Sequence, residues 1–158
     1  DLGCCPSPFD SYLMTLGLET LSLRVRHEVE SARRLAEYCR NHPKVERVSF
    51  VGFESHPSYA NAKKYFRFGS SAVFTIELKG TLDSTVRFVE SLNLAAHMVM
   101  IGDSVTVVTH PASTTHKQLG DADLAAAGVT PTMLRISVGL ENTDDLIDDF
   151  EQAFAHIG

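Results

Sequence analysis

Long runs of charge, long apolar runs and glycine-rich loops are all absent from this sequence, and each absence excludes a class of protein. The 158 residues hold 20 acidic and 14 basic side chains, a formal net charge of −6 with no long run of either sign, so we expect no nucleic-acid partner. No stretch reaches the roughly 20 apolar residues that span a bilayer, and the chain does not open on a basic segment followed by an apolar one, so we expect no membrane partner and a cytoplasmic protein. The ten glycines are scattered, which argues against a dinucleotide or P-loop site.

Metal-binding and disulfide patterns are also missing. The three cysteines include the adjacent pair Cys4 and Cys5, and no CxxC pair is present, so we expect reduced, structural cysteines. His110 and His116 stand six residues apart without a neighbouring cluster of carboxylates or cysteines, so we expect no metal site.

The polar segment HPASTTH, which covers residues 110–116, contains a serine and two histidines. Ser113 and His116 have a Ser-x-x-His spacing that is common by chance, and the strand-turn-helix context of a nucleophile elbow is missing. We therefore expect His110, Ser113, Thr115 and His116 to line a pocket, or the hydroxyls to satisfy their own backbone amides in a turn.

The pattern of apolar residues predicts alternating helices and strands. Ser7 and Pro8 are typical of a helix start, and we expect one long helix over about 8–41 whose stretch from Tyr12 to Leu23 is apolar nearly all round and needs a partner surface. Further predicted strands cover 45–51, 71–78, 105–109 and about 133–138, and predicted helices cover 58–66, 82–92, 123–127 and a last segment from about 142. We expect a single domain over 1–158 with an α/β two-layer sandwich, a mixed sheet and helices mainly on one face.

Arg135 interrupts an apolar strand. Leu134, Ile136 and Val138 should face one way, and Met133, Arg135 and Ser137 the other. Either this is an edge strand with Arg135 in solvent or paired with an acidic side chain, or the guanidinium is a bidentate clamp for a carboxylate ligand. The position alone leaves both interpretations open.

Short sequence words spread over most of the chain, from about Ser7 to Phe154, carry a family resemblance. They are SPFD (7–10), GLETLSLR (17–24), SHP (55–57), AKKY (62–65), GD (102–103), HPASTTH (110–116), GVTP (128–131) and LRISVGLE (134–141). In order and spacing they resemble the C-terminal third of the Cys/Met metabolism enzymes that depend on pyridoxal phosphate (PLP). The fold expected from this resemblance is that of the C-terminal small domain of fold-type I PLP transferases.

Within that family the pair Thr114 and Thr115 is most similar to O-acetylhomoserine sulfhydrylases. The resemblance implies a transferase of methionine biosynthesis in which PLP helps to expel acetate from O-acetylhomoserine, so that sulfide or a thiol adds and homocysteine or methionine forms. The alternatives are a γ-lyase, a cystathionine γ-synthase, an O-succinylhomoserine sulfhydrylase, or a stand-alone module of the same fold without catalysis.

The resemblance also implies roles for particular residues. Arg135 matches the arginine that binds the substrate α-carboxylate, and Thr106 matches a serine or threonine that assists there. Met100 stands where relatives often have asparagine, which puts that polar contact in doubt.

The lysine that binds PLP in this family has no counterpart in the chain, and Lys63 and Lys64 match a helical stretch that does not supply it. We therefore expect no catalytic residue and no covalently bound PLP in this chain. The expected partners are a PLP-binding N-terminal domain, an amino-acid substrate and further copies of the full-length enzyme in a tetramer. Because the chain opens on Asp1 rather than Met, the leading hypothesis is a domain separated from such an enzyme.

Overall fold

A computed structural model describes residues 3–157, and its centre is a five-stranded mixed sheet with the strand order β1-β2-β5-β4-β3. The strands are β1 (Val45–Ser49), β2 (Val73–Leu78), β3 (Ala96–His97), β4 (Val107–Thr109) and β5 (Met133–Ser137). The pairs β1/β2, β2/β5 and β4/β5 are antiparallel, whereas β3 and β4 are parallel. The strand β5 therefore lies inside the sheet, between β2 and β4.

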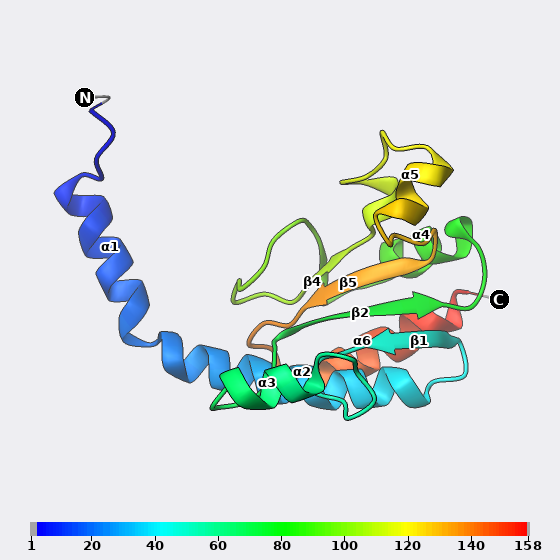
Figure 1. Cartoon of the computed structure of the whole chain (residues 1–158), viewed down its shortest axis with the longest axis horizontal. Coiled ribbons are helices and arrows are strands. Elements are labelled where there is room, and N and C mark those ends of the chain that lie inside the picture. The colour runs from blue at the N-terminus through cyan, green and yellow to red at the C-terminus, as the bar shows by residue number, and fades with distance from the viewer. Residues whose placement is uncertain (1–2, 158) are drawn as a thin grey trace.

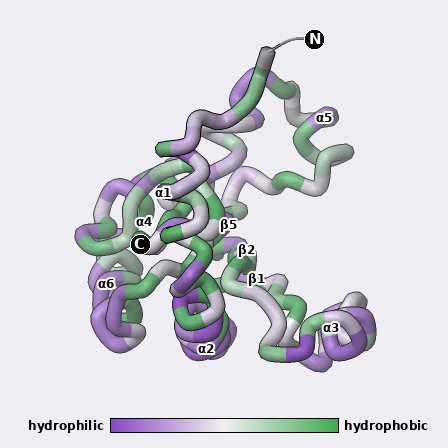
Figure 2. Tube along the Cα trace, turned by 90° about the vertical axis from the view of Figure 1, so that its left-hand side faces the viewer, coloured by the Kyte–Doolittle hydropathy of each residue, from purple (hydrophilic) through white to green (hydrophobic). Residues whose placement is uncertain are grey.

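Three helices cover one face of this sheet, as Figures 1 and 2 show: α2 (Leu21–Asn41), α4 (Leu82–Glu90) and α6 (Thr143–Ala155). The alternation in β2 and β5 turns apolar side chains such as Phe74, Ile76 and Leu134 toward the helices, where they are buried. Phe88 and Phe150 from α4 and α6 meet them there as an edge-to-face pair. The predicted two-layer α/β sandwich with helices mainly on one face is confirmed.

The helical start of the chain differs from the prediction of one long helix over about 8–41. The structure has α1 (Pro8–Glu19) and α2 with a break at Thr20, whose backbone leaves the helical region at φ −106° and ψ 2°. Gly17 weakens the helix just before the break, and the guanidinium of Arg24 donates to the Gly17 carbonyl and to the Thr20 hydroxyl. The prediction of one unbroken helix is therefore wrong, and the Arg24 side chain bridges the break at Thr20.

The α1 helix is well capped but poorly covered. Ser7 and Asp10 form a capping box, in which the Asp10 amide donates to Ser7 Oγ at 3.1 Å. No residue of α1 is buried, although it presents Phe9, Tyr12, Met14 and other large apolar side chains. In Figure 1 the helix projects away from the α/β body.

The remaining elements are short. They are α3 (Tyr59–Tyr65), the 3-10 turn η1 (Pro111–Ser113) and α5 (Asp121–Ala126). The prediction missed β3, because two residues are too few to show alternation. In the part of the chain that the structure describes, no helix has both the length and the apolar character needed to cross a membrane.

Candidate functional site

Arg135 lies in the middle of the sheet and not at its edge. In the ladder it stands opposite Thr75 of β2 on one side and opposite Thr109 of β4 on the other. Its neighbours Leu134 and Ile136 are fully buried on the helical side, so the half-buried Arg135 side chain belongs to the opposite face. The edge-strand interpretation of this arginine is therefore wrong.

The acceptors that the structure describes at the guanidinium are neutral. Its Nη2 donates to Thr109 Oγ1 at 3.2 Å and, more weakly, to the Met100 carbonyl at 3.4 Å. The Thr109 hydroxyl donates in turn to the Met98 carbonyl at 2.6 Å. Nε is buried and has no hydrogen-bond partner among the described residues. None of the carboxylates whose side chains the structure describes forms an ion pair with Arg135.

This arrangement leaves a half-covered cation with a free donor. A guanidinium that is removed from water costs free energy unless an anion or further acceptors compensate it. The planar fork of arginine matches a carboxylate with two parallel donors. The site can therefore accept a carboxylate that comes from outside the described residues.

Thr106, the second predicted carboxylate ligand, lies elsewhere. Its side chain is fully buried. Its Oγ1 donates to one oxygen of Glu141 at 2.7 Å, and its backbone amide donates to the other at 2.6 Å. Oγ1 also accepts the Gly139 N–H at 2.9 Å. This hydroxyl is fully engaged within the chain, and the threonine at the guanidinium is Thr109, which sequence reasoning missed.

The HPASTTH segment forms a compact turn. His110 is 1 % exposed, its Nε2 lies 2.9 Å from the Pro131 carbonyl and its Nδ1 lies 2.8 Å from Ser113 Oγ. Burial, the largest influence, lowers the pKa of this imidazole below its ordinary value. His110 and Ser113 line a cavity of about 40 Å³ together with His97. The structure does not bring Thr115 and His116 to that cavity: Thr115 Oγ1 lies 2.8 Å from His116 Nδ1.

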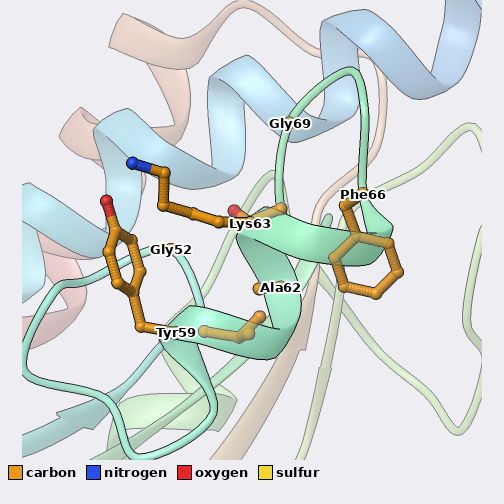
Figure 3. A pocket seen from close by; sticks show the side chains of 8 residues that line it. Gly52, Tyr59, Ala62, Lys63, Phe66 and Gly69 are labelled. Carbon is orange, nitrogen blue, oxygen red and sulfur yellow. The ribbon is translucent and has the colours of Figure 1, made fainter.

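A larger hollow of about 260 Å³ lies beside α3 (Figure 3). It is lined by residues such as Gly52, Tyr59, Ala62 and Lys63. Both Lys63 and its neighbour Lys64 are exposed, and the Lys63 ammonium lies 5.5 Å from the centre of the Tyr59 ring. Both lysines lie in α3, which agrees with the helical stretch that the sequence words predict for them.

Comparison with known proteins identifies the family. The family model for Cys/Met metabolism PLP-dependent enzymes matches residues 1–155. The chain belongs to this family. The resemblance found in the sequence words is therefore confirmed, and PLP is the cofactor of the family.

Named relatives and a solved structure agree with this assignment. The chain is 46% identical to a homocysteine synthase of Schizosaccharomyces pombe over 97% of this chain and 36% of that protein. It is 42% identical to O-acetyl-L-homoserine sulfhydrylase 1 of Thermus thermophilus over 98% and 37% of the two chains. A crystal structure from Campylobacter jejuni, named as an O-acetylhomoserine (thiol)-lyase with a pyridoxyl-lysine phosphate, matches with a TM-score of 0.90 and 35% identity, over 98% of this chain and 37% of that one. The chain thus spans little more than a third of the relatives' length.

Proposed function

We propose that the polypeptide containing this chain is a PLP-dependent O-acetylhomoserine sulfhydrylase, and that this chain supplies the wall that binds the substrate α-carboxylate. The observation that carries the proposal is Arg135, a half-buried guanidinium inside the sheet with a buried, unpartnered Nε. Relatives named homocysteine synthase and O-acetyl-L-homoserine sulfhydrylase support the choice of substrate.

The residues at Arg135 fit the substrate and not the cofactor. Its described partners are the Thr109 hydroxyl and the Met100 carbonyl, and neither carries the amine that a Schiff base with the aldehyde of PLP requires. When bound, PLP withdraws electrons from the substrate Cα so that acetate can leave from the γ-carbon. Arg135 would hold the carboxylate by two parallel hydrogen bonds, and this fixes the orientation of the substrate toward the cofactor. Holding PLP itself would fall to the rest of the polypeptide.

The apolar surface of α1 supports a partner domain in the same polypeptide. A 12-residue helix with exposed Phe9, Tyr12 and Met14 and no buried residue needs a cover. The chain spans only about 36% of relatives such as the homocysteine synthase, so the remaining two thirds are the natural cover. The tetrameric assembly and the cytoplasmic location expected from the sequence stay predictions.

Product analysis tests the proposed reaction. The purified full-length enzyme is incubated with sulfide in three parallel reactions, which contain O-acetylhomoserine, O-succinylhomoserine or methionine. We expect homocysteine from O-acetylhomoserine at a rate far above that from the succinyl ester, and no α-keto acid from methionine. A preference for the succinyl ester, or elimination from methionine, would replace the proposed activity with that of another member of the family.

The gene decides between a domain of an enzyme and a stand-alone module. We expect the open reading frame to continue upstream of the codon for Asp1 into a segment with the PLP-binding lysine. A start codon shortly upstream of Asp1, itself preceded by a stop codon in frame, would favour the module.

A further inference from the structure

A surface segment of residues 98–105, here called the strap, lies beside Arg135. It joins β3 to β4 and supplies the Met100 carbonyl to the guanidinium. Its apolar side chains are outside the core: Met98, Val99 and Met100 are each about half exposed. Burial of its own side chains therefore does not fix the position of the strap.

Hydrogen bonds to the end of β5 and to the residues after it fix the strap instead. The Gly102 amide donates to Ser137 Oγ at 3.1 Å, and the Leu140 amide donates to the Ser104 carbonyl at 2.8 Å. Each of these ties uses one neutral hydrogen bond. The strongest tie lies just past the strap, where both carboxylate oxygens of Glu141 bind the amide and hydroxyl of Thr106.

Gly139 allows the backbone after β5 to pack closely against the backbone of residues 104–106. Its amide donates to Thr106 Oγ1 at 2.9 Å, so one hydroxyl joins Glu141 to the backbone after β5. A Cβ at Gly139 would lie 2.5 Å from the Ser104 carbonyl oxygen and 2.6 Å from the Thr106 nitrogen. Only a glycine lets the two backbones approach this closely.

We propose that Glu141, acting through Thr106, is a positioning residue that fixes the strap and thereby orients Arg135 for the substrate carboxylate. The inference rests on the proposed role of Arg135 and extends it to residues that never touch the substrate. The link is continuous: the Glu141 carboxylate holds Thr106, Thr106 directly follows the strap, and the strap carbonyl of Met100 accepts from Arg135.

The test is a set of variants in the full-length enzyme, with KM for O-acetylhomoserine, kcat and the melting temperature measured for each. Glu141→Gln and Thr106→Val should each raise KM about tenfold, because a loosened strap misplaces the guanidinium, while kcat changes less than KM. Thr106→Ser keeps the hydroxyl and should rescue most of the loss seen with valine. Thr85→Val is the matched control, since Thr85 is also fully buried but donates to the carbonyl of Thr81, the residue that caps its own helix α4. It should lower the melting temperature without raising KM.

The decisive comparison uses a double variant of Arg135 and Glu141. In an Arg135→Ala background, Glu141→Gln should raise KM no further, because no guanidinium remains to be oriented. Suppose that Arg135→Ala raises KM. The positioning role of Glu141 is then wrong, while the clamp stands, if Glu141→Gln alone leaves KM unchanged or if it adds its full effect to that of Arg135→Ala in the double variant. If Arg135→Ala itself leaves KM unchanged, the clamp and the positioning role both fall. If Glu141→Gln does not fold, Thr106→Val and Thr106→Ser are compared instead, in the original enzyme and in Arg135→Ala. That comparison tests the positioning role in the same way.

Discussion

At the scale of single residues, the hydrogen-bond partners of His110 fix its tautomer, and its burial lowers its pKa, which makes the stability of the fold depend on pH. The Pro131 carbonyl can only accept, so Nε2 carries the proton and Nδ1 accepts from the Ser113 hydroxyl. Burial holds the pKa of His110 below its ordinary value of 6.5; the Pro131 bond opposes this in part, and His97 adds a smaller lowering. The folded chain therefore keeps this imidazole neutral under conditions in which the unfolded chain would protonate it.

The pH dependence of stability tests this account of His110. Because the folded pKa is lowered, its contribution to stability is complete above about pH 6.5 and is lost as the pH falls toward the folded pKa. We expect the free energy of unfolding to decrease below about pH 6.5, and His110→Gln to make that decrease shallower. His42, whose pKa is also lowered by burial, should account for a remaining slope. His156→Gln, at an exposed position, is the control. An unchanged slope in His110→Gln would show that the imidazole does not titrate in this way.

The bond between Ser113 and His110 has the geometry of a nucleophile and its base, yet we predict no hydrolysis there. The imidazole is 1 % exposed, and the adjoining cavity of about 40 Å³ is close to the size of one water molecule. An ester substrate has no room beside the hydroxyl. We expect Ser113→Ala to leave the hydrolysis of p-nitrophenyl acetate by the enzyme at its original rate. Esterase activity that disappears in this variant would overturn the prediction.

At the scale of elements, the sequence predicts best where burial imposes a period. The strand β2 and its neighbour β5 follow from the alternation of Phe74, Ile76 and Leu78 and of Leu134 and Ile136. The register between strands and the local contacts at helix ends produce no periodic pattern in the sequence. The pairing of Thr109 with Arg135, which makes Thr109 and not Thr106 the neighbour of the guanidinium, is set by the ladder between β4 and β5. The break at Thr20 likewise depends on contacts of the Arg24 side chain.

The α1 helix gives a prediction at this scale. A 12-residue helix without a buried residue is marginal in water. In the isolated chain we expect its amides to exchange with solvent at nearly unprotected rates, whereas in the full-length enzyme they should be at least about tenfold slower. The amides of α6, which packs Phe150 into the core, are the control and should be protected in both. Equal exchange of α1 in the two proteins would contradict a covering domain.

At the scale of the whole molecule, the described residues form one α/β layer pair. The α1 helix at one end has no buried residue, and the Arg135 Nε on the sheet face opposite the helices has no described hydrogen-bond partner. The sequence words identify the family because they extend over almost the full chain, and the family model matches residues 1–155. The identity of Arg135 as the candidate clamp could be proposed from its motif. The strap and its fixation by Glu141 could not, because they depend on contacts between residues about 35 positions apart.

The measurement that tests the central claim most directly is the kinetics of Arg135 variants in the full-length enzyme. A charge-assisted pair with a carboxylate contributes about 1.5–3 kcal/mol, so Arg135→Ala should lower kcat/KM for O-acetylhomoserine by roughly 10- to 150-fold, mostly through KM. Arg135→Lys should recover part of the loss, because it keeps the charge without the fork. The inhibition constant of 3-aminopropyl acetate, which lacks the carboxylate, should be the same for all three proteins. If Arg135→Ala stayed within about twofold of the original kcat/KM, or weakened the carboxylate-free inhibitor as much as the substrate, the assignment of this chain as the carboxylate-binding wall would be wrong.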